Sequence, residues 1–211
     1  MFSVRGFFLY MLVRNFQQHD LPLASSMAFN AWMQEDFGDT RFDLGRLVYE
    51  YMVRYYFRSA HFSRVMVPRE APHDVLSFLL AYRPQEQTPA QDWLEKQLSK
   101  VSATDAQVAL QYQRYLSTQS QRISDLAQEQ NYLIAGLFIS RRPGCGSPLM
   151  RALLEQAQNE GFDSLYLWAD ANCNCQYYQR HGFVQAARFE QSAFIEDQKL
   201  DIVVFKKEFQ R

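Results

Sequence analysis

The sequence predicts an α/β (α+β) protein with a sheet of six or seven strands, and two observations carry this prediction. Short apolar runs that are typical of strands recur from residue 7 to residue 205. Between them, apolar side chains repeat at helical spacing. The chain has 211 residues and is 47% hydrophobic, which is ample for a core. We therefore expect one domain over residues 1–211.

The first part of the chain reads as a strand, two helices and two strands. The strand is expected from Phe7 to Arg14, and Asp20 with Pro22 marks the start of the first helix. The second helix has a heavily aromatic face and ends near Arg58. Two strands are expected over residues 63–67 and 75–83, with a polar turn between them.

Residues 84–130 form a polar, glutamine-rich segment that reads as an insertion of helices. Thr88 and Pro89 open one helix, and apolar positions from Val108 to Leu126 mark a longer one. Because that longer helix has an apolar stripe, we expect the insertion to pack on the domain. The chain then continues with a strand over 131–139, a helix from about Leu149 to Gly161, a strand over 165–168, a short helix, and strands over 183–190 and 200–205.

The composition argues against nucleic acid, a membrane and a metal ion as partners. The 22 basic and 23 acidic side chains give a formal net charge of -1, so nothing favours nucleic acid or an anionic membrane surface. The apolar run over residues 7–13 is too short to span a bilayer and is not framed as a signal peptide. Three cysteines, an odd number, do not suggest a disulfide framework, so a cytoplasmic location is expected. A lone C-x-C with scattered histidines is poor metal spacing, and we expect no metal.

The stretch from Ser140 to Ser147 predicts an anion site. Gly144 and Gly146 let the backbone turn so that several N–H groups converge, and a helix begins near Pro148. Arg141 and Arg142 add positive charge. Alternatively, such a turn is an ordinary helix start.

Two motifs resemble the GNAT family of N-acetyltransferases. The family's acetyl-CoA loop reads Arg or Gln, two residues, Gly, one residue, then Gly or Ala, and residues 141–146 match it. A short helix of the family ends in Tyr, three residues, then Gly-Phe, which Tyr178, Gly182 and Phe183 match. The resemblance covers residues 131–183, is only topological over 7–83, and is absent for the insertion. Arg142 and Pro143 depart from the residues common in the loop, and Asn172 is one position nearer Tyr178 than the family's usual asparagine.

The resemblance implies a GNAT fold, with a central, mixed, mostly antiparallel twisted sheet flanked by helices and a helical insertion between strands three and four. It implies an acyltransferase that moves an acetyl group from acetyl-CoA to an amine by direct attack. The cofactor-binding residues that it implies are Leu137, Phe138, Ile139, Arg141, Arg142, Gly144, Cys145, Gly146, Ser147, Asn172, Asn174 and Tyr178. Either asparagine could instead cap the short helix.

The resemblance also implies catalytic residues. Tyr178 is the general acid, or else a packing tyrosine that only orders the cofactor. Glu129 and Asp170 lie where the family often places a water-linked carboxylate, or else are ordinary polar residues at strand ends. Cys145 is not expected to act as a nucleophile, because the family's chemistry proceeds by direct attack.

The acceptor pocket in such a fold implicates the aromatic face of the first two helices, with the inserted helices as a lid: Trp32, Phe37, Tyr51, Tyr55 and Tyr56. The alternative is that these side chains are simply core. The resulting hypothesis is a small-molecule primary amine as acceptor. The alternatives are a non-catalytic module that binds acyl-CoA or a partner protein, and a protein or peptide N-acetyltransferase. The final strands of such folds often pair, which allows a homodimer.

Overall fold

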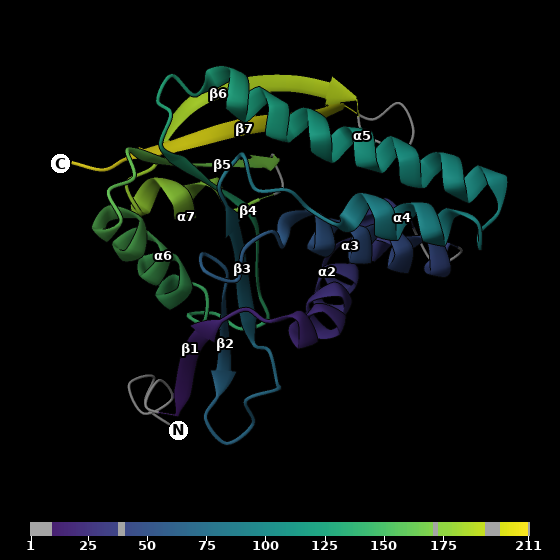
Figure 1. Cartoon of the computed structure of the whole chain (residues 1–211), viewed down its shortest axis with the longest axis horizontal. Helices are drawn as coiled ribbons and strands as arrows, with labels where there is room; N and C mark the ends of the chain where they lie inside the picture. The colour runs from purple at the N-terminus through teal and green to yellow at the C-terminus, as the bar shows by residue number, and fades with distance from the viewer. Residues whose placement is uncertain (1–9, 38–40, 171–172, 193–198, 211) are drawn as a thin grey trace.

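The computed structural model describes residues 10–37, 41–170, 173–192 and 199–210. At its centre is a seven-stranded sheet with the strand order β1-β2-β3-β4-β5-β7-β6 (Figure 1). The neighbours β4 and β5 run parallel, and the other described pairs are antiparallel, which confirms the mixed, mostly antiparallel sheet. The strands are β1 (Met11–Asn15), β2 (Arg64–Pro68), β3 (Ser77–Tyr82), β4 (Tyr132–Ser140), β5 (Ser164–Asp170), β6 (Val184–Ser192) and β7 (Lys199–Glu208).

Apart from a short 3-10 helix that was not predicted, the helices follow the order that the sequence predicts. They are the short 3-10 helix η1 (Gln18–Asp20), α2 (Leu21–Asp36), α3 (Phe42–Tyr56), α4 (Ala90–Leu98), α5 (Ala103–Leu126), α6 (Ser147–Asn159) and α7 (Cys175–Arg180). The first strand was expected from Phe7, and residues 7–9 lie outside the described residues. In the described part of the chain, no helix combines the length and apolarity that crossing a bilayer requires.

Alternation along the strands places a separate core on each face of the sheet. In β3, for example, Phe78 and Leu80 belong to one buried cluster, whereas Leu79 and Ala81 belong to the other. Helices α2, α3, α4 and α5 bury their apolar residues in the first cluster, and α6 buries its own in the second, where α7 also packs. Figure 1 shows the same division, with α6 and α7 apart from α2, α3 and α4. The fold therefore has three layers.

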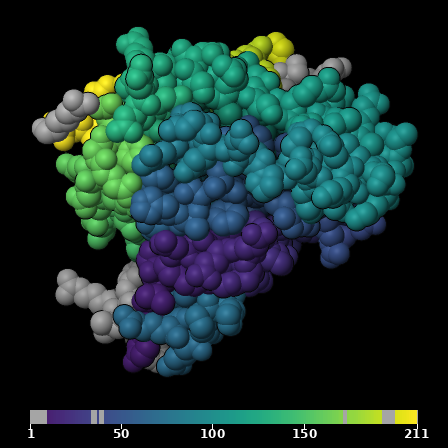
Figure 2. All heavy atoms as spheres, in the orientation of Figure 1, coloured from purple at the N-terminus to yellow at the C-terminus, as the bar shows by residue number. Residues whose placement is uncertain are grey.

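The predicted insertion consists of α4 and α5, between β3 and β4. Ser102 caps α5, because its hydroxyl accepts a hydrogen bond of 3.1 Å from the backbone N–H of Asp105. Arg41, just before α3, forms an ion pair of 2.9 Å with the same aspartate. The stripe of Tyr112, Leu116 and Ile123 is buried. Helix α5 runs beside α4 and along β6 and β7 (Figure 1). The residues of α4 and α5 cover much of the face that Figure 2 shows. The insertion thus packs on the domain.

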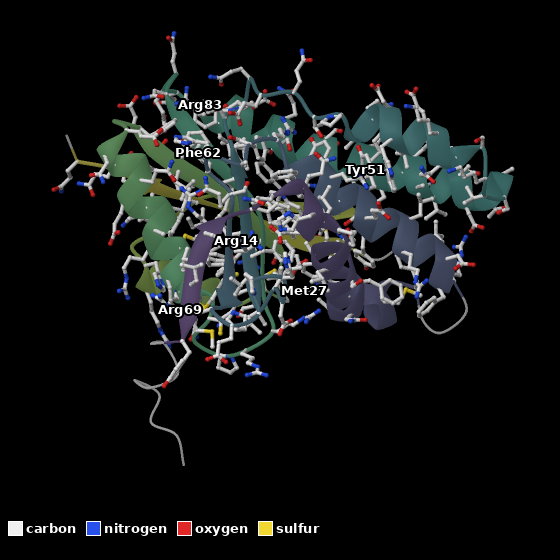
Figure 3. The ribbon with its side chains drawn as sticks, turned by 60° about the horizontal axis from the view of Figure 1, so that its bottom comes forward. Arg14, Met27, Tyr51, Phe62, Arg69 and Arg83 are labelled. Carbon is white, nitrogen blue, oxygen red and sulfur yellow. The ribbon has the colours of Figure 1, made fainter. Side chains whose placement is uncertain are left out.

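Asp20 does not cap α2 with its side chain, although the sequence suggested an N-cap there. Its carboxylate is buried and accepts two hydrogen bonds from Arg14 of β1, at 2.7 and 2.8 Å, and one of 2.8 Å from the Gln17 backbone N–H. Arg14 is labelled in Figure 3. Burial alone would raise the pKa of Asp20, but these hydrogen bonds and the Arg14 charge lower it overall. The pair joins the first strand to the first helix.

Asp20→Asn should lower the free energy of unfolding by about 1.5–3 kcal/mol at pH 7, because it removes hydrogen bonds to a buried charge. A carboxyl with a lowered pKa stabilises the fold above its unfolded value and loses this effect as pH falls through the folded value. The difference between variant and wild type in urea denaturation should therefore shrink in acid. Asp201→Asn, which breaks the exposed pair with Arg188, serves as the control and should cost far less. Equal losses from both variants would contradict this account.

Candidate functional site

The parallel strands β4 and β5 pair only at their beginnings. The register joins Tyr132–Ile134 to Ser164–Tyr166, after which β4 continues to Ser140 and β5 to Asp170. From Ala135 onward, the edge of β4 that faces β5 has no ladder partner among the described residues. Unpaired backbone donors and acceptors of this kind can pair with an extended ligand as an added strand would. The split therefore places Leu137, Phe138 and Ile139 on an edge that is open to an extended ligand.

A bulge at Gly136 marks where the two strands part. The register with β3 passes from Leu137, opposite Leu80, to Ala135, opposite Ala81, so Gly136 has no partner of its own. A Cβ atom at this position would lie 2.1 Å from the ring of Tyr56. Only glycine lets α3 approach the strand so closely at this point.

The loop after β4 has the shape that its glycines predict. Gly144 has a φ of 86°, in the left-handed region that favours glycine. At Gly146 a Cβ atom would lie 2.5 Å from the Phe138 ring, so close packing of the loop on β4 excludes a side chain there. The Cys145 N–H donates to the Arg142 carbonyl within the loop, at 3.2 Å. Of the N–H groups of Gly144, Cys145, Gly146 and Ser147, which the resemblance implies for phosphate binding, that of Cys145 is therefore used within the loop.

A pocket of about 550 Å³ lies against this loop, which we call the loop pocket. Its charged lining residues in the described part of the chain are Arg141 and Arg142, and the N-terminus of the 13-residue helix α6 adds its positive end. Arg141 lies 3.9 Å from Asp74 at the rim. The pocket is lined by Phe138, Ser140, Arg141, Arg142, Pro143, Gly144, Gly146, Ser147, Cys173, Asn174, Tyr177 and Tyr178. Its chemistry suits an anion such as a pyrophosphate.

A second cavity of about 390 Å³, the inner cavity, lies in the split between β4 and β5. Its walls come from both faces of the sheet, since Met150 and Leu167 belong to the α6 side and Tyr56 to the α3 side. The cavity is lined by Ala31, Trp32, Tyr49, Met52, Tyr56, Tyr112, Tyr115, Ala135, Gly136, Leu137, Phe138, Met150, Leu167, Trp168, Ala169, Asp170, Cys173, Tyr178 and Leu200. Apart from Asp170 these side chains carry no formal charge.

Three residues line both the loop pocket and the inner cavity: Phe138, Cys173 and Tyr178. The Tyr178 ring packs on Phe183 and Phe205, with ring centroids 6.0 and 5.6 Å apart. Burial raises the pKa of the Tyr178 phenol above its ordinary value, and Cys173 beside it raises the pKa further. The hydroxyl therefore stays protonated at neutral pH, as a general acid must.

The second motif has a structural reason for its spacing. Gly182 has a φ of 80° and ends α7 through a hydrogen bond of 3.0 Å from its N–H to the Gln179 carbonyl. The next N–H, from Phe183, donates to the Tyr178 carbonyl at 3.1 Å, and the Phe183 ring is buried. The tyrosine is thus fixed to the sheet by the turn that follows it.

Asn174, one of the two asparagines that the resemblance implicates, has a structural role at the start of α7. The Asn174 side chain caps α7 by accepting a hydrogen bond of 3.2 Å from the Tyr177 N–H, and the residue also lines the loop pocket. Asn172 lies outside the described residues.

The two carboxylates that the sequence suggested as bases, Asp170 and Glu129, lie in different surroundings. Asp170 lines the inner cavity, and its carboxylate accepts a hydrogen bond of 3.1 Å from the Cys173 N–H. Glu129 lines neither pocket; it accepts hydrogen bonds from Ser164 and, at 2.9 Å, from Tyr166, and lies 3.3 Å from Lys206. Although burial opposes it, this bonding lowers the pKa of Glu129 to about 2. A carboxylate so placed joins the strands together and is unsuited to accept a proton from an amine.

The thiols of Cys145 and Cys173 are both held in the protonated form. The Cys145 side chain is buried in the core beneath the loop, and burial raises its pKa. Burial and the neighbouring Asp170 raise the pKa of Cys173 to about 12, so its thiol is also protonated. No three histidine, cysteine, aspartate or glutamate side chains group to hold a metal within the described residues.

The acceptor residues that the sequence suggested separate into two sets. Trp32 and Tyr56 line the inner cavity, whereas Phe37, Tyr51 and Tyr55 are buried but are not among its described walls. Tyr51, labelled in Figure 3, packs on Tyr55, whose hydroxyl donates to Ser120 of α5 at 3.0 Å. The walls instead include Tyr49 and Met52 of α3, and Tyr112 and Tyr115 of α5, which the sequence reasoning missed. The spacing 49, 52, 56 marks one helical face and could have indicated the first two.

No protein-family model matches the sequence. A search of curated proteins also finds no matching sequence. Solved structures do match along nearly the whole chain. Ard1 from Thermoplasma volcanium is 14% identical with a TM-score of 0.54, and the match covers 96% of this chain and 99% of that chain.

Two further structures match over 95% of this chain and 99% of theirs. A GCN5-related N-acetyltransferase from Kribbella flavida is 13% identical with a TM-score of 0.55. Arylalkylamine N-acetyltransferase 2 from Aedes aegypti is 9% identical with a TM-score of 0.57. The described sheet order, the split between β4 and β5, and these matches agree with one another. The chain therefore has the fold of the GCN5-related N-acetyltransferases, the GNAT family that its two motifs resemble.

Proposed function

We propose that this chain is an acetyl-CoA-dependent N-acetyltransferase that acts on a primary amine of a small molecule. The observation that carries the proposal is the meeting of two chemically different cavities at Tyr178 and Phe138. One is a basic pocket at a helix start, and the other is an aromatic cavity in the split between β4 and β5. A transferase with two substrates needs such an arrangement, because its reacting groups must meet inside the protein.

The donor side supplies what coenzyme A would require. Arg141, Arg142 and the N–H groups of Gly144, Gly146 and Ser147 would bind the pyrophosphate at the start of α6. None of these three N–H groups donates to a backbone carbonyl within the described residues. The unpaired edge of β4 would hold the pantetheine arm, which leads the thioester toward the junction of the pockets. Asn174, already fixed as a cap, would add a polar contact at the pocket wall.

The reaction then follows by direct attack. The amine nitrogen forms a bond to the thioester carbonyl carbon, the C–S bond breaks, and the developing oxyanion is stabilised by N–H groups along the unpaired edge of β4. Tyr178 donates its proton to the departing thiolate, whose ordinary pKa of about 8.5 lies below that of the phenol, so close placement is essential. The proton on nitrogen passes to Asp170, directly or through water.

Support for a small acceptor comes from the shape of the inner cavity. It lies in the split between β4 and β5, and side chains of α2, α3 and α5 form its walls. Its volume of about 390 Å³ suits one small ligand. Two similar structures are named for small amines, agmatine and arylalkylamines.

The experiment measures release of free CoA thiol from acetyl-CoA with a panel of small amines, amino acids, aminoglycosides and peptides. We expect release only when an amine is present, with one acetylated amine formed for each CoA. Calorimetry with CoA alone tests the donor side independently. If CoA bound but no acceptor were acetylated, a non-catalytic binding module would be the better account. If only peptides reacted, the small-molecule proposal would be wrong.

A further inference from the structure

Six aromatic rings form a continuous series along the wall of the inner cavity: Trp32, Tyr49, Tyr112, Tyr115, Trp168 and Tyr56. Successive ring centroids from Trp32 to Trp168 are 6.1, 6.4, 6.1 and 5.8 Å apart. These distances are those of stacked and edge-to-face pairs. The Trp168 indole N–H then donates to the Tyr56 hydroxyl at 3.2 Å and joins the last ring to the series.

The six rings come from four elements, and two of the rings belong to the insertion. Trp32 belongs to α2, Tyr49 and Tyr56 to α3, and Trp168 to β5. Tyr112 and Tyr115 belong to α5, the segment that the two sequence motifs leave unexplained. Helix α5 packs against α3 and β5. The insertion therefore builds part of the cavity wall.

Several polar groups of these aromatic side chains already form hydrogen bonds within the protein. The Trp168 N–H and the Tyr56 hydroxyl bond to each other, and the Tyr112 hydroxyl donates to the sulfur of Met52 at 3.0 Å. At these positions the wall therefore presents ring faces and edges to a ligand. A sugar or a polyamine would lose its own hydrogen bonds to water there without replacing them.

The charged end of the cavity is the end where the two pockets meet. Asp170 is the one formally charged side chain among the described walls, and its carboxylate bonds the N–H of Cys173, a residue at the junction. An ammonium group would be drawn to this end, next to Tyr178. The other end of the same ligand would then lie among the rings.

We propose, on the basis of the acetyl transfer argued above, that the acceptor is a primary amine joined by a short alkyl chain to an aromatic ring. The ring packs against the six-ring wall, and the amine lies between Asp170 and the thioester. Edge and face contacts between rings add to simple burial, so an aromatic group binds better than a saturated one of the same size. Helix α5 is thus a specificity element of the enzyme.

The test compares matched amines under the same conditions. We expect kcat/KM for 2-phenylethylamine to exceed that for 2-cyclohexylethylamine by about threefold to tenfold, as ring-to-ring contacts of ordinary strength imply. The diamine 1,4-diaminobutane and glucosamine should react far more slowly than either. A preference for the diamine or the sugar would overturn the proposal, and so would equal rates for the two ring compounds.

Variants of the wall give a second readout. Tyr115→Leu and Trp32→Leu should raise KM for 2-phenylethylamine by about tenfold while changing KM for hexylamine much less. Trp93→Phe is the matched control, because Trp93 packs under Arg54 at 4.7 Å and does not line the cavity. This variant should keep the wild-type KM values. If Tyr115→Leu affected both amines equally, the ring contacts would not be the cause.

A binding measurement without turnover separates this proposal from the proposed function. The chain has three tryptophans, and Trp93→Phe leaves the two that line the cavity. In this variant, 2-phenylethylamine should change the tryptophan fluorescence with a saturable dependence, and hexylamine should need higher concentrations. Failure of CoA to bind would overturn acetyl transfer itself. If CoA bound and amines were acetylated without any aromatic preference, only the present proposal would fail.

Discussion

Tyr178→Phe should lower kcat for amine acetylation by about 10²–10³-fold, because the departing thiolate would lose its proton donor. The phenylalanine ring keeps the contacts with Phe183 and Phe205, so the affinity for CoA should stay close to that of wild type. Stopped-flow or steady-state measurement of CoA thiol release gives kcat, and calorimetry gives the affinity. A fall in kcat without a fall in affinity is the signature of an acid that acts on the leaving group.

The neighbouring tyrosine provides the control for that substitution. Tyr177 lines the loop pocket but is not among the described walls of the inner cavity, so Tyr177→Phe should change kcat only slightly. The pH profile adds a further check. Because burial raises the pKa of Tyr178 above its ordinary value of 10, the acid stays protonated and the wild-type rate should not decline through its ionisation below about pH 10. Unchanged turnover in Tyr178→Phe at every pH would leave Tyr178 as a packing residue only.

The backbone features of the two motifs could be predicted from sequence because they depend on local geometry. Gly144 has a positive φ, Gly182 ends α7 in the same way, and both requirements can be inferred from glycine and its neighbours. Asn174 caps the short helix, which its residue type already allowed. The distance along the chain between the two motifs then fixed one helix and one strand between them.

The walls of the inner cavity could not be predicted in the same way. Ten residues of α3 are buried, including four tyrosines, so hydrophobic periodicity alone does not distinguish core from cavity wall. Tyr49 and Tyr56 face the cavity and Tyr51 and Tyr55 do not, because the orientation of α3 depends on α5 and on the close approach at Gly136. That glycine within a strand was itself a signal of a bulge.

The position of Glu129 relative to the two pockets also depends on tertiary structure. Its position just before β4 was correct, but sequence does not show at which end two parallel strands separate. The paired end of β4 and β5 is the end near Ser164, where Glu129 is bound, and the open end is the one that carries Asp170. Strand polarity and register, which are tertiary properties, decide between the two carboxylates.

Gly146→Ala should weaken CoA binding by about tenfold or more, although it adds only one methyl group. Gly146 has a φ of -80°, which alanine adopts without strain, so backbone conformation is not the cause. The cause is the Phe138 ring, whose Cζ atom would lie 2.5 Å from the new Cβ atom. Relief of that overlap moves the loop away from β4 or turns the Phe138 ring into the pockets, and either change disturbs the place where the N–H groups at the start of α6 would bind the pyrophosphate.

The double variant Gly146→Ala with Phe138→Leu tests this cause directly. Leucine lacks the Cζ atom, so the loop could return to β4 and part of the affinity for CoA should be restored relative to Gly146→Ala alone. Phe138→Leu by itself is the reference, because Phe138 lines both pockets. Calorimetry with CoA measures all four proteins of the cycle. If the effects of the two substitutions on CoA affinity simply added, contact between Gly146 and Phe138 would not control the anion site. Another constraint would then explain why the motif has glycine at position 146.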